Sequence, residues 1–125
     1  LNTISARTVT FLENKIIAIA GENRGNGAIR LVEIDPKTLE MNKQGEEDMH
    51  RDSLIWRNGE DLYGIISQDG NLYLGRFNAD LECLARSSVP VPPYGAINFQ
   101  GDLLTTQRAD GSVLILDAGN LTERK

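Results

Sequence analysis

Three stretches with the same pattern decide the fold: IDPKTLE at residues 34–40, FNADLE at 77–82 and LDAGNLT at 116–122. Each begins with an apolar residue that ends a strand, continues through a turn led by Asp or Asn, and reaches a Leu that starts the next strand. The leucines stand at positions 39, 81 and 121, so they are separated by 42 and then 40 residues. That spacing is typical of repeats that each form one small sheet.

A second set of turns follows the same period. Asp-Gly pairs at 69–70 and 110–111 each divide two apolar runs, as hairpin turns do, and the glycine-rich stretch 21–27 takes this place in the first copy. One earlier turn per copy is marked at 14–15, 58–59 and 100–101. Three turns per copy indicate four strands. We therefore predict an all-β protein with three tandem four-stranded antiparallel repeats, over about residues 7–49, 50–92 and 93–125, in one domain covering residues 1–125.

The apolar pattern within the copies favours stacked sheets. Residues 16–20 (IIAIA) and 63–66 (YGII) are apolar at both alternating positions, which predicts strands covered on both faces, whereas 39–42 (LEMN) alternates as a half-exposed strand does. For the middle copy we expect strands at about 53–57, 62–67, 72–77 and 81–86. We expect 45–56 to be a connection and 81–86 a strand, although both have helix-like composition.

Repeats of this kind resemble the blades of a β-propeller, and the alternative is a β-trefoil, which also has three four-stranded repeats and closes within one chain of this length. Three blades leave a propeller ring incomplete. The propeller interpretation therefore predicts exposed blade faces, covered by the rest of a longer chain or by a second copy, because repeats are stable only when neighbours cover their apolar faces. The start at Leu1, with no leader, indicates an excised piece of a longer protein.

Composition argues against several classes of function. The chain has 13 Lys and Arg against 18 Asp and Glu, for a net charge of −5, and no basic cluster, so we expect no nucleic-acid partner. No apolar run is long enough to cross a bilayer, so we expect no membrane-spanning segment. The single Cys83 excludes an internal disulfide and a metal site made of cysteines alone.

Candidate chemistry gathers around His50, the only histidine, which lies among acidic residues at 46–48 and 52. One His and the distant Cys83 fall short of the three or four ligands of a zinc site, and no Asp-x-Asp-x-Asp-Gly calcium loop is present. No Gly-x-Ser-x-Gly elbow or second triad member accompanies His50. We therefore expect no catalytic residue, metal or cofactor, and we interpret the chain as a non-enzyme.

Four residues are candidates for binding a partner. Arg24 and Asn26 lie in the glycine-rich stretch 21–27, which lacks the Lys-Ser/Thr pair of a phosphate loop and is better explained as a long hairpin whose tip contacts a partner. Trp56 and Tyr94 are the other two, either as part of an aromatic surface for sugars or peptides or as packing between blades. PVPPY at 90–94 fits the spacing of a polyproline ligand, but its place between the second and third copies favours a stiff linker.

Two resemblances to known families follow from these repeats. The joint DPKTL at 35–39 resembles the recurring joint of YVTN and quinoprotein-like propellers, and the chain as a whole resembles the carboxy-terminal region of the spirochaete P83/100 surface-antigen family. The second resemblance implies a cell-envelope or periplasmic location and an antigen-like role, and it brings no catalytic residues.

We thus expect a non-catalytic protein-interaction or scaffolding module. It would bind a protein partner or self-associate as a homodimer or higher oligomer. The alternative is a fragment of a propeller enzyme or of a small-ligand or glycan-binding domain, in which the site would be completed by blades outside this sequence.

Overall fold

The computed structural model describes residues 3–21 and 28–124, and these form eleven β-strands and no helix. The strands make three antiparallel sheets, each a meander of strands consecutive in the sequence: β1–β4, β5–β8 and β9–β11. The all-β prediction of three tandem antiparallel repeats is therefore confirmed. The strands are β1 (Thr3–Leu12), β2 (Lys15–Gly21), β3 (Arg30–Ile34), β4 (Met41–Gln44), β5 (Trp56–Asn58), β6 (Asp61–Gln68), β7 (Asn71–Phe77), β8 (Cys83–Arg86), β9 (Asn98–Gln100), β10 (Leu103–Gln107) and β11 (Val113–Asp117).

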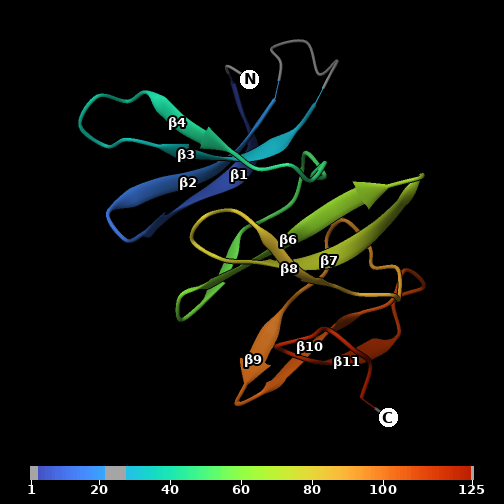
Figure 1. Ribbon diagram of the computed structural model, residues 1–125. Helices are drawn as coiled ribbons and strands as arrows, with labels where there is room; N and C mark the ends of the chain where they lie inside the picture. The colour runs from blue at the N-terminus through green and yellow to red at the C-terminus, as the bar shows by residue number, and fades with distance from the viewer. Residues whose placement is uncertain (1–2, 22–27, 125) are drawn as a thin grey trace.

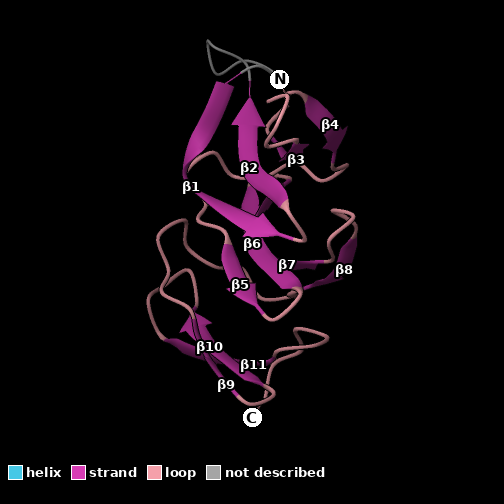
Figure 2. Ribbon diagram, turned by 90° about the vertical axis from the view of Figure 1, so that its left-hand side faces the viewer, coloured by secondary structure: helices cyan, strands magenta, loops and turns pink. Residues whose placement is uncertain are grey.

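The three sheets follow one another along the molecule, with the β5–β8 sheet between the other two (Figures 1 and 2). The first sheet carries the N-terminal strand, and the chain leaves the third sheet at the opposite end of the molecule. Among the described residues, no strand of one sheet pairs with a strand of another. The β-trefoil alternative is therefore wrong, because a trefoil requires the three repeats to pair into one closed structure.

The three predicted joints are built in the same way. In each, the side-chain oxygen of the leading Asp or Asn accepts the N–H two residues on, at 2.7–2.9 Å (Asp35, Asn78 and Asp117). The leucine donates its N–H back to the carbonyl of that residue at 2.7–3.0 Å and has a left-handed backbone, with φ of 60–65° (Leu39, Leu81 and Leu121). The sequence register that aligned the three leucines thus matches a local geometry that recurs three times.

The third repeat departs from the expected four strands. The place of its fourth strand is held by one isolated bridge between Leu116 and Glu123, next to which the N–H of Arg124 donates to the carbonyl of Ile115 at 2.8 Å. The third sheet therefore has three strands, because only this short stretch follows the joint in an extended pairing.

The limits of the middle repeat also differ from the prediction. Its first strand begins at Trp56 rather than at residue 53, because Ser53 makes a different contact. The Ser53 hydroxyl accepts the N–H of Ile65 at 2.8 Å and donates to the carbonyl of Leu54 at 2.7 Å. As expected, residues 45–55 form a connection, and a turn at 79–80 leads into the strand at 83–86.

Two hydrophobic layers fill the spaces between the sheets. The first joins side chains of the β1–β4 sheet, such as Ile17 and Leu31, to Leu62 and Phe77 of the β5–β8 sheet. The second joins the other face of the middle sheet to the third sheet, and it includes Leu104, Leu114, Leu116 and Leu121. The middle sheet is thus covered on both faces, as predicted from strand residues that are apolar at both alternating positions.

Candidate interaction surface

The β1–β4 sheet has an apolar face that points away from the rest of the molecule. Strand pairing sets Phe11 opposite Ile16, Ile16 opposite Ile34, and Ile34 opposite Met41, so these four side chains share one face. They alternate with Ile17, which packs toward the middle sheet. We define the open face as these side chains together with two neighbouring apolar residues, that is, Val9, Phe11, Ile16, Ile34, Leu39 and Met41.

The large side chains of the open face are exposed. The exposed fraction is 72% for Leu39, 59% for Phe11, 51% for Val9 and 41% for Met41. The centre of the same face is buried, since Ala18, Ala20 and Val32 are at most 4% exposed, so the exposed side chains lie on the edge strands β1 and β4 and at the joint. Isolated exposed apolar residues are ordinary on a protein surface, but a contiguous group on one sheet marks an interaction site.

The equivalent residues of the other two repeats are buried. Leu81 and Leu121, which occupy the same joint position as Leu39, are only 3% and 1% exposed. They lie in the hydrophobic layers between the first and second sheets and between the second and third sheets, respectively. Leu39 therefore occupies a position that is covered in the other two repeats and is exposed in the first.

The same comparison applies to the paired residues on the strands. The pair Ile16–Ile34 corresponds to Leu62–Phe77 in the second sheet and to Leu104–Leu116 in the third, since each pair occupies the strand position just before the joint. Both corresponding pairs are at most 1% exposed and each packs against the preceding sheet. Ile16 and Ile34 are only partly buried. The difference lies in the cover and not in the sequence, because all three pairs are large and apolar.

The third sheet exposes its own outward face at the other end of the molecule. Val113 is 64% and Ile115 38% exposed, and they pair with Gln107 and Thr105 on β10. Val113 occupies the strand position of Leu31 and Leu74, which are buried against the next sheet. The outward face of the third sheet is thus also a packing position without a cover, but polar residues interrupt it.

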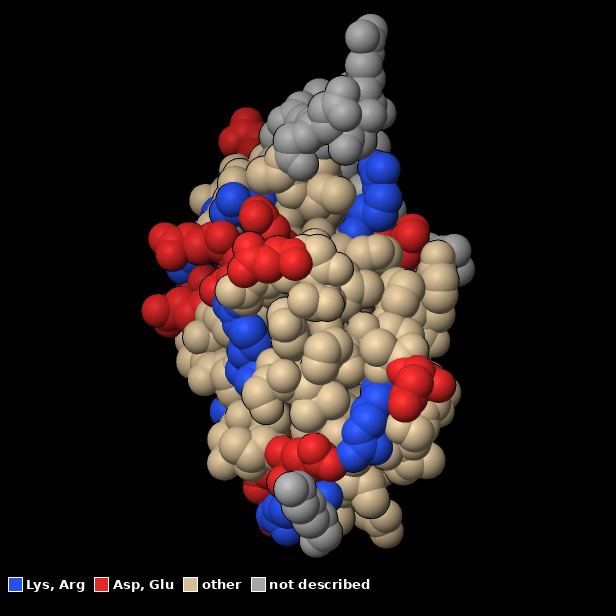
Figure 3. All heavy atoms as spheres, turned by 90° about the vertical axis from the view of Figure 1, so that its right-hand side faces the viewer, with Lys and Arg blue, Asp and Glu red and all other residues tan. Residues whose placement is uncertain are grey.

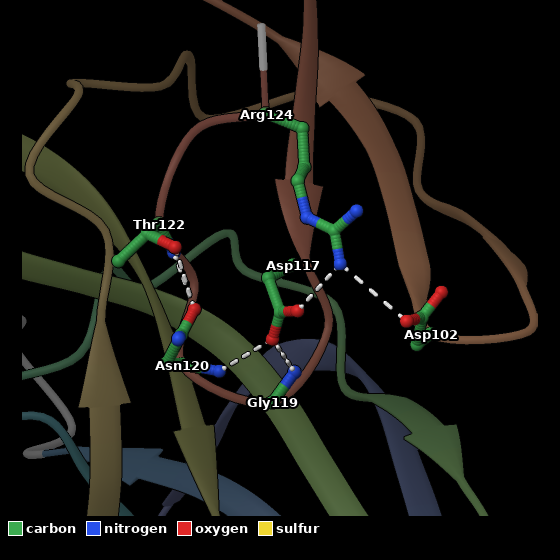
Figure 4. A network of polar contacts seen from close by, with 6 residues as sticks. All are labelled: Asp102, Asp117, Gly119, Asn120, Thr122 and Arg124. Atoms are coloured by element: carbon green, nitrogen blue, oxygen red, sulfur yellow. Dashed lines mark hydrogen bonds and ion pairs between the residues drawn. The ribbon is translucent and has the colours of Figure 1, made fainter.

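Polar contacts fix the last joint beside this outward face (Figure 4). One oxygen of Asp117 accepts the N–H groups of Gly119 and Asn120 at 2.9 and 3.0 Å, and the other lies 3.0 Å from the Arg124 guanidinium. The Asn120 N–H and this guanidinium, together with the Gly119 N–H, lower the pKa of the Asp117 carboxyl, because each stabilises the charged form. Arg124 also reaches Asp102 at 3.4 Å. This network stabilises the turn, and its polar side chains are engaged with one another and with the backbone.

Of the four sequence-based partner candidates, the structure describes Trp56 and Tyr94. Arg24 and Asn26 lie outside the described residues. Trp56, at the start of β5, is partly buried against the layer between the second and third sheets. Tyr94 lies in the connection before β9 and is 70% exposed. Tyr63 is buried, where its hydroxyl donates to the carbonyl of Ala118 at 2.6 Å.

Two of the four acidic residues around His50 form ion pairs. Glu47 pairs with Arg86 at 2.6 Å and Asp48 with Arg30 at 3.0 Å. The Nδ1 atom of His50 accepts the N–H of Asp52 at 3.2 Å. Within the part of the chain that the structure describes, no three His, Cys, Asp or Glu side chains lie close enough together to hold a metal ion.

The surface charges are interspersed on the side of the molecule shown in Figure 3, where basic and acidic side chains lie near one another with uncharged surface between them. Cys83 is partly buried, and this burial raises the pKa of its thiol. Among the described residues, these interspersed charges form no basic patch that would bind phosphate. The raised pKa also means that the Cys83 thiol is not an activated nucleophile.

The sequence interpretation predicted exposed blade faces, but its candidate partner residues, Arg24, Asn26, Trp56 and Tyr94, are not residues of the open face. The residues it missed are Phe11 and Leu39 together with Val9 and Met41. A signal was present, because Leu39 aligns with Leu81 and Leu121 in the repeat register. Alignment alone could not show which of three equivalent leucines lacks a covering sheet.

Comparison with known proteins gives one family. The model of the family described as Borrelia P83/100 protein matches residues 1–97. None of the curated proteins matches the chain. Among the described residues, no helix has the length and apolar character needed to span a membrane.

Proposed function

The chain belongs to the Borrelia P83/100 protein family, and from this premise we propose that it is a non-catalytic protein-interaction module of a spirochaetal surface antigen. Its binding surface in this proposal is the open face of the β1–β4 sheet. The observation that carries the proposal is the exposure of Leu39 at 72%, at a joint position where Leu81 and Leu121 are 3% and 1% exposed.

The contrast among the three leucines supports protein binding over other roles. A sheet face of large aliphatic and aromatic side chains is favourable in water only when another apolar surface covers it, at about 25 cal/mol per Å² of apolar area buried. The six side chains that define the open face are apolar, which favours an apolar protein surface over sugars and nucleotides, since those need convergent polar groups. Protein–protein interfaces, in contrast, have an apolar core surrounded by a polar rim.

The same proposal includes a propeller-like assembly and an envelope location. Three consecutive meander sheets, each packed on the next, support this part of the proposal, because neighbouring propeller blades pack in this way and the last blade of an incomplete ring leaves one face uncovered. The envelope or periplasmic location follows from the resemblance to spirochaete surface antigens. No arrangement of the described residues favours the alternative of a propeller enzyme or glycan-binding fragment.

Differential capture tests the proposed function. The protein is immobilised and exposed to an envelope extract of its own organism, in parallel with the variants Phe11→Glu and Leu84→Glu. Leu84 is 47% exposed on β8 and lies outside the open face, so its variant is the matched control. We expect a protein that the parent and the Leu84→Glu variant retain and the Phe11→Glu variant loses. Retention of the same proteins by all three, or of none, would overturn the proposal.

A further inference from the structure

The chain carries both halves of one sheet–sheet interface at its two ends. Inside the molecule this interface occurs twice, and each time the face equivalent to the open face packs on the outward face of the preceding sheet. In the first sheet that outward face includes Leu31, and in the second sheet Leu74. Val113 holds this position in the third sheet and is 64% exposed, while Leu31 and Leu74 are 3% and 0% exposed.

The two uncovered faces are therefore complementary, because their equivalents pack on each other inside the molecule. One is the receiving half of the interface, with Phe11 and Leu39 exposed, and the other is the covering half, in which Val113 holds the position of Leu31 and Leu74. The equivalents of both halves pack together within this chain. A surface that fits another part of the same molecule brings copies together head to tail.

We propose that the partner that covers the open face is a second copy of this chain, which contributes the outward face of its β9–β11 sheet. The inference rests on the proposed function and names its partner. Two copies related by a twofold axis each supply one half to each of two identical contacts. The result is a ring of six sheets, in which the two uncovered faces of each copy are covered.

The covering half of the third sheet is more polar than its two counterparts. Thr105 stands at the position of Ile17 and Tyr63, and Gln107 at that of Ile19 and Ile65. The contact between copies is consequently wetter than the internal ones, and we expect it to be reversible, with association at micromolar concentrations or above. This polarity also keeps the exposed face compatible with water in the dissociated chain.

Sedimentation velocity of the intact protein and three variants tests the inference, over about 1 to 200 µM. We expect the parent protein to shift from the monomer to twice its mass. Leu39→Lys on the open face and Val113→Glu on the third sheet should each weaken association by about tenfold or more, because each places an unpaired charge in the contact. The control Leu84→Lys, on an exposed residue outside both faces, should associate as the parent does.

Mixing the two interface variants distinguishes this contact from others. In a head-to-tail pair of Leu39→Lys with Val113→Glu, one contact is unsubstituted and the other holds two opposite charges, so the mixture should recover association that neither variant has alone. A symmetric contact between two open faces would ignore Val113→Glu and would not recover.

Three outcomes would overturn the second-copy inference: a monomer throughout the range, association unaffected by Val113→Glu, or an open series of larger assemblies. Because both substituted residues are exposed, circular dichroism should show each variant folded as the parent. A monomeric chain that still captures another protein through Phe11 would leave the proposed function standing and remove only the second copy.

Discussion

At the scale of single residues, each joint depends on one side-chain oxygen that accepts backbone N–H groups. The first and third joints use the carboxylates of Asp35 and Asp117, and the second uses the amide of Asn78. The N–H contacts need only an acceptor oxygen, which either residue type supplies. The charge of Asp117 matters for a different reason, because Arg124 lies 3.0 Å from it.

Asp117→Asn should therefore keep the turn and lose the charge-dependent part of its stability. The pKa of Asp117 is lowered in the folded protein, below the value of about 3.9 expected for an unfolded chain. A lowered folded pKa contributes stability above the unfolded value, and this contribution is lost as the pH falls through the folded pKa. Thermal unfolding should show the parent more stable than Asp117→Asn at pH 7, with a difference that shrinks below about pH 4. A difference that is the same at both pH values would contradict this role of the charge.

Leu39 and Leu81 occupy the same joint position, one exposed and one buried, so substituting each shows how much burial contributes to stability. Leu81→Ala removes a buried side chain from the layer between the first and second sheets, and should cost about 2–5 kcal/mol of unfolding free energy. Leu39→Ala changes an equivalent but exposed residue, and in dilute protein should change that free energy by less than about 0.5 kcal/mol. Urea unfolding measures both. Equal losses would mean that Leu39 is covered within the single chain.

At the scale of strands, two buried serines continue the hydrogen bonding where a strand has stopped. Ser53 accepts the N–H of Ile65 at 2.8 Å, and Ser87 accepts the N–H of Leu74 at 3.0 Å. Both hydroxyls also donate to a nearby carbonyl, that of Leu54 or Val89. The backbone N–H groups of the middle sheet thus keep partners next to the connections.

Ser87→Ala should leave the N–H of Leu74 buried without its hydroxyl partner. An unsatisfied buried donor costs about 1–3 kcal/mol, so unfolding in urea should show a loss in that range. Ser88→Ala is the control, because Ser88 is exposed and its change should be close to neutral. A loss no larger for Ser87→Ala than for Ser88→Ala would show that water or a backbone shift satisfies this N–H.

The number of repeats and most strands could be predicted from the sequence because turn residues and apolar parity are local properties. The joints at 34–40, 77–82 and 116–122 needed only the short-range preferences of Asp, Asn and Gly. The late start of β5 was not predictable in this way, since it depends on a contact between Ser53 and Ile65 across the sheet. The single bridge at Glu123 likewise reflects tertiary pairing rather than strand preference.

At the scale of the whole molecule, three sheets in sequence produce two covered interfaces and two uncovered faces. The apolar pattern of residues 16–20 indicated that the first sheet should be covered on both sides. The structure buries both alternating positions of this stretch from Ile17 onward, and the large exposed side chains of the sheet lie outside it, on β1, on β4 and at Leu39. The site could not be identified from sequence because exposure depends on which sheets are present. The residue type at the joint is leucine in all three repeats, and only the packing around it differs.

Footprinting of the open face tests the central claim that this face binds protein. A carbene label reacts with accessible side chains, and its attachment to each residue is read by mass spectrometry. We predict that Phe11, Leu39 and Met41 are labelled strongly in dilute protein and lose label when the protein is concentrated or given its captured partner. Leu84 and Tyr94, which are exposed elsewhere, should be labelled equally in every state. Unchanged labelling of Phe11, Leu39 and Met41 in all these states would contradict the account.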